Sequence, residues 1–124
     1  MTPTLLIGED EPHLEEILSY VAKKLGLKYS IARDGQEVLE KARELVPDLL
    51  LLDLYMPKMN GIEVCRALKN DPATSKIYII MITASAKKVD EDDARIAGTN
   101  EFITKPFSPT QLQKRLSEII SENI

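Results

Sequence analysis

Acidic, hydroxyl and ammonium side chains follow the apolar runs of this sequence. Glu9 and Asp10 come after the first run, Asp53 ends a run of four leucines, Thr83 ends a run rich in β-branched residues, and Lys105 follows the last run. An ionised carboxylate beside an apolar core is costly unless a cation meets it. Clustered carboxylates suit Mg²⁺, and aspartate is a known covalent phosphoryl acceptor. These residue types therefore indicate metal-assisted phosphoryl transfer, provided that the ends of the runs meet in space.

The elements that must position these side chains alternate along the chain. Short apolar runs predict strands at 4–8, 28–32, 49–53, 77–82 and 101–104. The leucine run is typical of a strand that is buried on both faces. Amphipathic patterns between the runs predict helices that begin at Pro12, after Asp34-Gly35, near Ile62, near Lys87 and at Ser108-Pro109. Five strands alternating with five helices predict an α/β domain with a parallel sheet.

The carboxyl ends of parallel strands lie at one edge of a sheet, and ligands of open α/β sheets bind beyond that edge. Three carboxylates, one hydroxyl and one ammonium are therefore expected together. Each residue alone has a plainer interpretation: Asp10 as a helix cap, Asp53 as the start of a turn, Thr83 as a strand end and Lys105 as a solvated lysine. Their joint position at four strand ends, in the required order, favours the functional interpretation.

Composition narrows the classes of protein. The 124 residues suit one domain, and the net charge of −4 argues against direct nucleic-acid binding. No apolar run approaches the roughly 18 residues of a membrane helix, and no signal peptide is evident, so a cytoplasmic location is expected. The lone Cys65 is predicted to be core and His13 to be solvated, while Asp90-Glu91-Asp92-Asp93 is interpreted as a solvated face at a helix N-terminus.

Taken together, Glu9-Asp10, Asp53, Thr83 and Lys105-Pro106 closely resemble the receiver domain of bacterial two-component response regulators, including the chemotaxis regulators, over essentially the whole chain. The resemblance implies a flavodoxin-like (βα)5 three-layer sandwich, whose five-stranded parallel sheet has the order 2-1-3-4-5. It also implies that residues 1–124 are a single receiver domain with no output domain in this chain.

The resemblance assigns the phosphoryl and metal chemistry to particular residues. Asp53 would accept a phosphoryl group from a histidine kinase or a small phosphodonor. Asp10, Asp53 and the backbone carbonyl of Tyr55 would hold Mg²⁺, with Glu9 acting directly or through water. Tyr55 and Ser85 occupy the positions where the family tunes the lifetime of the phosphoryl group.

Further residues are implied in the switch. Thr83, Lys105 and the backbone N–H of Ala84 would contact the phosphoryl oxygens, and the Lys105-Pro106 bond would be cis. Phe102 occupies the position of the switch aromatic, which moves inward as Thr83 moves toward the phosphate.

The resemblance also implies partners. The phosphoryl donor would be a sensor histidine kinase or a histidine phosphotransfer protein. The output partner or domain would bind the surface of the fourth helix, fifth strand and fifth helix, and a homodimer that forms on phosphorylation is one form of output. The domain would be a signalling switch that catalyses its own phosphotransfer and autodephosphorylation, and not a metabolic enzyme.

Three positions depart from the family pattern: Glu9 replaces the commoner Asp, Gly8 lacks a side chain, and Phe102 lacks the hydroxyl of the frequent Tyr. The first two motivate an alternative, a receiver-like interaction module that is never phosphorylated. A flavodoxin-like cofactor binder is a weaker alternative. No glycine-rich phosphate loop follows the first strand, and Glu9-Asp10-Glu11 would repel a phosphate in the absence of metal.

Overall fold

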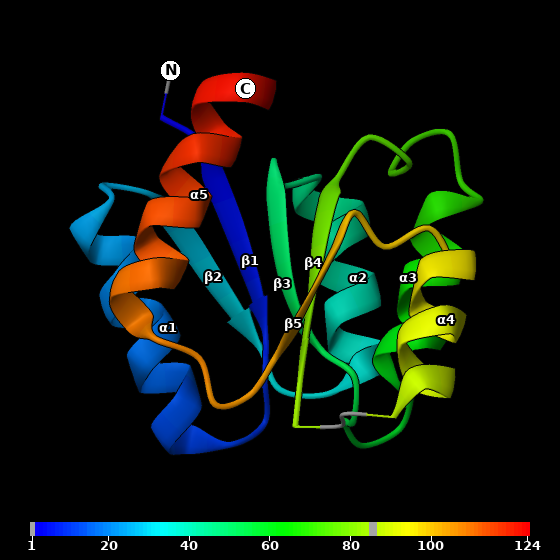
Figure 1. Cartoon of the computed structure of the whole chain (residues 1–124). Helices are drawn as coiled ribbons and strands as arrows, with labels where there is room; N and C mark the ends of the chain where they lie inside the picture. The colour runs from blue at the N-terminus through cyan, green and yellow to red at the C-terminus, as the bar shows by residue number, and fades with distance from the viewer. Residues whose placement is uncertain (1, 85–86) are drawn as a thin grey trace.

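A computed structural model of the chain describes residues 2–84 and 87–124, and the described part alternates strands with helices (Figure 1). The strands are β1 (Thr4–Gly8), β2 (Lys28–Ala32), β3 (Leu49–Asp53), β4 (Tyr78–Thr83) and β5 (Glu101–Thr104). The helices are α1 (Pro12–Lys24), α2 (Gly35–Leu45), α3 (Gly61–Lys69), α4 (Lys88–Ile96) and α5 (Pro109–Asn123). Four strands have the predicted bounds, and β4 begins and ends one residue later than its apolar run predicted.

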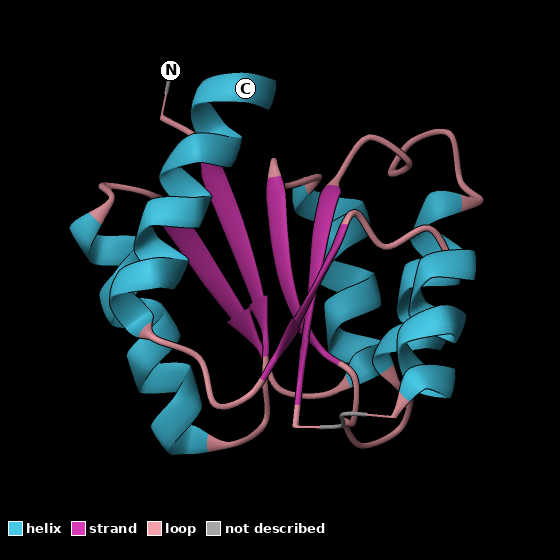
Figure 2. Cartoon of the chain, in the orientation of Figure 1, coloured by secondary structure: helices cyan, strands magenta, loops and turns pink. Residues whose placement is uncertain are grey.

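The strands form one parallel sheet in the order β2-β1-β3-β4-β5, as the resemblance implied. Parallel neighbours need crossover connections, and here each connection carries a helix. Helices α1 and α5 cover one face of the sheet, while α2, α3 and α4 cover the other (Figure 2). The predicted three-layer sandwich is therefore confirmed.

Strand β3 lies at the centre of the core. All four leucines of the run 49–52 have an exposed fraction of 0%. Leu50 and Leu52 pack with α2, α3 and α4, whereas Leu49 and Leu51 pack with α1 and α5, because successive strand side chains point to opposite faces. Truncating such a leucine to alanine costs about 2–5 kcal/mol. Asp53 is thus attached to a strand that is buried along its whole length.

Four helices begin with side-chain caps near the carboxyl edge of the sheet. Glu11 caps α1 by accepting hydrogen bonds from the backbone N–H groups of His13 and Leu14, at 2.9 and 2.7 Å. The plainer interpretation of Asp10 as this cap is therefore wrong, because its neighbour fills that role. Caps also precede the other three helices, and they are Asp34 for α2, Asn60 for α3 and Ser108 for α5.

Two glycines lie where other segments leave no room for a side chain. Gly35 is the first residue of α2, and a Cβ atom there would lie 1.9 Å from the carbonyl oxygen of Met59 in the loop after β3. The backbone N–H of Gly35 donates to the carbonyl of Pro57 at 3.1 Å, which fixes that loop against α2. At Gly8, a Cβ atom would lie 2.8 Å from a methyl group of Val38. Val38 therefore occupies the space that a side chain at position 8 would need.

Candidate functional site

Asp53 is the last residue of β3, and its side chain is held through both oxygens. Its exposed fraction is 7%. The Oδ1 atom accepts a hydrogen bond from the backbone N–H of Tyr55 at 3.1 Å, and the Oδ2 atom accepts one from Lys105 Nζ at 3.2 Å. The bond to Tyr55 shows that Asp53 also supports the turn after β3. Its structural role and a chemical role are therefore compatible.

Glu9 is almost fully buried beside Asp53, with an exposed fraction of 1%. Its Oε2 atom accepts hydrogen bonds from the backbone N–H groups of Asp10 and Glu11, both at 3.1 Å, and its Oε1 atom lies 3.5 Å from Lys105 Nζ. Burial raises the pKa of Glu9 to about 7, and the hydrogen bond and negative charge of Asp53 act in the same direction. The N–H of Glu11 and the Lys105 ammonium oppose this rise without cancelling it.

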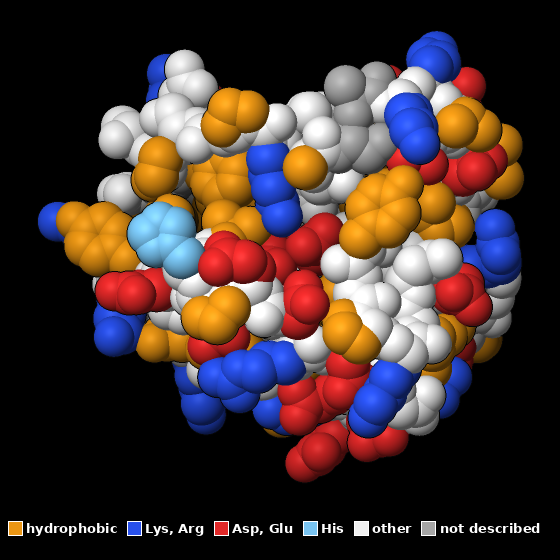
Figure 3. All heavy atoms as spheres, turned by 90° about the horizontal axis from the view of Figure 1, so that it is seen from below, with side chains coloured by type: hydrophobic (Ala, Val, Ile, Leu, Met, Phe, Trp, Pro, Cys, Tyr) orange, Lys and Arg blue, Asp and Glu red, His pale blue; other side chains and the backbone are white. Residues whose placement is uncertain are grey.

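One carboxylate oxygen from each of Glu9, Asp10 and Asp53 lies within 4.8 Å of the other two. Seen from below, acidic side chains gather at the centre of this edge, with a basic side chain beside them (Figure 3). Lys105 brings one positive charge to three carboxylates. The donor set consists of hard oxygen ligands with an excess of negative charge, so its chemistry fits a cation such as Mg²⁺.

Thr83 and Lys105 come to the site from β4 and from the end of β5. Thr83 is fully buried, and its carbonyl accepts a 2.7 Å hydrogen bond from the backbone N–H of Lys105. The Lys105 side chain is 22% exposed and contacts both Asp53 and Glu9, so its interpretation as a solvated lysine is wrong. The Lys105-Pro106 peptide bond is cis, as the resemblance implied.

The other residues that the sequence assigned to the site lie around the carboxylates and Lys105. Tyr55 is 57% exposed, and its hydroxyl donates to Asp90 Oδ2 at 2.6 Å. Phe102 is half-buried and packs against the core on the side of α2, α3 and α4. Ala84 is exposed at the end of β4, and Ser85 lies outside the described residues.

Comparison with known families decides the classification. The model of the response regulator receiver domain matches residues 5–117. The chain belongs to this family. Receiver domains act in two-component phosphotransfer signalling, where response regulators work with histidine kinases and output domains, and they bind Mg²⁺ at an acidic site.

Individual relatives agree with this classification. The receiver domain is 38% identical over 123 residues to the DNA-binding response regulator MtrA of Mycolicibacterium smegmatis, and that match covers 99% of this chain and 53% of the relative. The chain spans about half the length of the curated relatives that it matches. Within the described residues, no helix combines the length and apolar character that crossing a membrane requires.

Solved structures are similar over nearly the whole chain. A putative response regulator from Chloroflexus aurantiacus has a TM-score of 0.90 at 30% identity, covering 98% of this receiver domain and 100% of that chain. The receiver domain of the sensor histidine kinase PA1611 from Pseudomonas aeruginosa has a TM-score of 0.89 at 25% identity, with the same two coverages. The latter structure has a magnesium ion coordinated in its active-site cleft.

Sequence reasoning missed one residue beside the site of this receiver domain. Asp90 was interpreted as part of a solvated acidic face, but it accepts the hydrogen bond of Tyr55, and the neighbouring Glu91 pairs with Arg95 at 2.9 Å. The two bonded residues are 35 positions apart, so no local pattern connects them. The other two predictions hold: Cys65 is buried and His13 is exposed.

Proposed function

We propose that Asp53 is the phosphoryl acceptor of this receiver domain, and that the domain is a switch in a two-component phosphorelay. The observation that carries the proposal is the 3.2 Å contact between Lys105 Nζ and Asp53 Oδ2, inside a group that also contains Glu9 and Asp10. A nucleophilic carboxylate at the end of a rigid strand is well oriented for attack on phosphorus. The adjacent ammonium supplies positive charge to the oxygens of the incoming group.

In the proposed reaction, a carboxylate oxygen of Asp53 attacks the phosphorus atom of the donor. For a histidine kinase or a histidine phosphotransfer protein, the phosphorus–nitrogen bond of phosphohistidine breaks as the new phosphorus–oxygen bond forms. Lys105 then pairs with one phosphoryl oxygen, while the Thr83 hydroxyl and the backbone N–H of Ala84 donate to others. Thr83 lies at the end of β4, next to Lys105, which supports this division of roles.

We assign the metal site to Asp10, Asp53 and the backbone carbonyl of Tyr55, with Glu9 acting directly or through water. The three neighbouring carboxylates support this assignment. When bound, Mg²⁺ would neutralise charge on the transferring phosphoryl group. Burial and the charge of Asp53 raise the pKa of Glu9 to about 7, so a bound cation would relieve the repulsion between these carboxylates, which favours a metal-loaded site over one that takes up a phosphate alone.

The proposed switch runs from Thr83 to Phe102. Phe102 is half-buried in β5, so an inward movement of its ring would alter the surface of α4, β5 and α5. This surface would bind an output partner or domain, or a second copy of the chain. We propose that residues 1–124 act as one receiver unit and bind no nucleic acid directly, in keeping with their net charge of −4. The cytoplasmic location stays a prediction.

The first test is the intact-protein mass after incubation with acetyl phosphate, with and without Mg²⁺. We expect the wild-type chain to gain one phosphoryl group only when Mg²⁺ is present, and Asp53→Asn to gain none. Asp48→Asn is the matched control, because Asp48 precedes β3 at the opposite edge of the sheet. That variant is expected to be modified like the wild type.

Two results would contradict the proposal. Modification of Asp53→Asn at the wild-type level would place the acceptor elsewhere. Absence of any adduct, even with phosphorylated kinases or histidine phosphotransfer proteins, would favour the interaction module that works without phosphorylation.

A further inference from the structure

A cleft at the amino edge of the sheet has the size of a small-molecule site. Its volume is about 520 Å³, within the range of about 300–1,000 Å³ that is usual for such sites. Its walls come from the ends of α2, α3 and α5 and from the segments that precede β3, β4 and β5. The cleft lies at the opposite edge of the sheet from Asp53, so the proposed phosphorylation makes no use of it.

Lys69 brings an ammonium group to the wall of this cleft. Its Nζ atom donates to the carbonyls of Ser75 and Ile77, at 3.1 and 2.6 Å, and all three residues line the cleft. The stem of the lysine packs against the turn after α4, where a Cβ atom at Gly98 would lie 2.9 Å from Lys69 Cγ. The ammonium is therefore held in place by α3, by the segment before β4 and by the turn after α4.

The positive charge of Lys69 has no counter-charge nearby. Within residues 2–84 and 87–124, no carboxylate oxygen lies within 4.0 Å of Lys69 Nζ. Burial lowers the pKa of Lys69, because a partly buried ammonium is poorly solvated. An ammonium has three N–H groups, and the two carbonyls use two of them. A bound anion would accept the third N–H and supply the missing negative charge.

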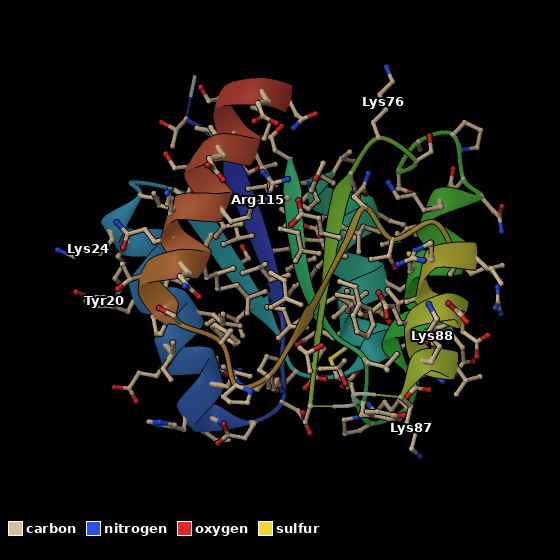
Figure 4. All side chains as sticks on the ribbon, in the orientation of Figure 1. Tyr20, Lys24, Lys76, Lys87, Lys88 and Arg115 are labelled. Carbon is tan, nitrogen blue, oxygen red and sulfur yellow. The ribbon has the colours of Figure 1, made fainter. Side chains whose placement is uncertain are left out.

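The other walls indicate what kind of anion fits the cleft. Lys76 also lines it, and its side chain extends away from the sheet, where it adds positive charge (Figure 4). Asp48 lines it too, but its Oδ2 atom already accepts hydrogen bonds from the backbone N–H and hydroxyl of Thr4. Val46 and Pro47 supply apolar surface, and Val46 is 46% exposed. The cleft therefore combines a cationic group with an apolar wall.

We propose that this cleft binds a small organic anion, whose carboxylate pairs with Lys69 and whose apolar part lies against Val46 and Pro47. Lys69 keeps its two bonds to backbone carbonyls, so the same side chain supports the fold and holds the ligand. A hydrogen bond between an ammonium and a carboxylate is roughly twice as strong as one between neutral groups. Binding in the cleft does not depend on phosphorylation of Asp53.

The test uses the full, unphosphorylated chain without Mg²⁺, at physiological salt, which screens the contacts of exposed lysines. Amide chemical shifts are followed during titration with hexanoate, with acetate and with the neutral hexanamide. We expect hexanoate to saturate the shifts of residues around Lys69 in the millimolar range. Hexanamide should bind at least about tenfold more weakly, because it lacks the charge. Acetate should also bind at least about tenfold more weakly, because each buried methylene group contributes up to about fourfold.

Matched variants assign the binding to the cleft. Lys69→Met keeps an apolar stem but removes the charge, and should weaken the binding of hexanoate by at least about tenfold. Lys28→Met is the control, because Lys28 is an exposed lysine that begins β2 at the same edge but does not line the cleft. Its affinity should equal that of the wild type. Lys76→Gln should weaken binding by only about twofold, because an exposed charge is screened.

Three outcomes would overturn the inference. Absence of saturating shifts around Lys69 throughout the millimolar range of hexanoate would show that the cleft holds no organic anion. Equal affinity for hexanoate and hexanamide would assign the cleft to apolar ligands, and this comparison needs only the wild type, so it decides the question even where Lys69→Met does not fold. Equal weakening by Lys28→Met and Lys69→Met would assign binding to overall charge. The adduct at Asp53 is measured separately by mass, so its absence would refute the proposed function and leave this inference standing.

Discussion

The two edges of the sheet use charged side chains in opposite ways. At the amino edge, Asp48 Oδ2 accepts hydrogen bonds from the backbone N–H and hydroxyl of Thr4, at 2.9 and 3.3 Å. Lys69 Nζ donates to the carbonyls of Ser75 and Ile77, at 3.1 and 2.6 Å. These charges satisfy the chain's own backbone. Lys76, also at this edge, extends away from the sheet (Figure 4).

At the carboxyl edge, charged groups face one another instead. Glu9 and Asp53 are buried side by side, and the pKa of Glu9 is raised to about 7 by burial and by Asp53. This arrangement opposes folding at neutral pH, whereas the amino edge supports it. Side chains that lower the stability of the fold, such as neighbouring buried carboxylates, are expected at functional sites. The difference between the edges therefore supports the proposal that the charges of the carboxyl edge serve chemistry, whereas those of the amino edge stabilise the fold.

The largest expected effect that tests this contrast is that of Glu9→Gln. The unfolded chain loses the Glu9 proton near its ordinary pKa of 4.5, and the folded chain near 7, so the metal-free wild type loses stability as the pH rises between these values. At about pH 8, Glu9→Gln should be more stable by about 3 kcal/mol, and near pH 4 the two should be similar. Urea unfolding across this range is the measurement. A variant that is less stable at the higher pH would show that the Lys105 contact outweighs burial.

A change of opposite sign is expected at the amino edge. Asp48→Ala leaves the backbone N–H of Thr4 without its carboxylate partner, and should lower the free energy of unfolding by about 2 kcal/mol. Because Asp48 is far from the carboxylates, the mass gained from acetyl phosphate should not change. Loss of phosphorylation in a folded Asp48→Ala protein would mean that the edges are not independent.

Magnesium should act on one edge alone. At a Mg²⁺ concentration about tenfold above the dissociation constant, a bound ion adds about 1.4 kcal/mol to the free energy of unfolding. We expect this gain in the wild type and in Asp48→Ala, and its loss in Asp10→Asn. Thermal unfolding with and without the ion measures it. An equal gain in Asp10→Asn would place the ion elsewhere.

The smallest expected effect concerns a strained residue at the amino edge. Val46 ends α2 with a φ angle of 40°, in the left-handed region that β-branched residues avoid. Asn tolerates this region, and Val46 is 46% exposed, so little apolar burial is lost on substitution. Val46→Asn should raise the free energy of unfolding by about 0.5–1 kcal/mol, measured with urea. A decrease would show that packing of the valine methyl groups outweighs the strain.

Most of the fold was predictable because its signals are local. The leucine run predicted the bounds of β3, and the residues at the strand ends predicted that Asp53, Lys105 and the acidic group lie at one edge. Smaller features, such as the residue that caps a helix, depended on contacts that no local sequence pattern shows. Glu11, and not Asp10, caps α1, because its longer side chain reaches the N–H groups of the first turn.

The contacts around the site were harder to anticipate than its members. The ammonium of Lys105 contacts both Asp53 and Glu9, so Glu9 is part of the charge balance around Asp53, a role that the sequence did not indicate. The absence of a side chain at Gly8, which the sequence marked as a departure, is explained by Val38 from α2. Such facts follow from the packing of elements that are distant in sequence.

The bond between Tyr55 and Asp90 also has a consequence for communication between the site and the output surface. Asp90 belongs to α4, a helix of the surface to which we assign output. A partner that binds α4 and shifts its first turn would act through this bond on the loop whose Tyr55 N–H bonds to Asp53. Because such coupling is reciprocal, two partners of the same domain would favour the modified form to different degrees.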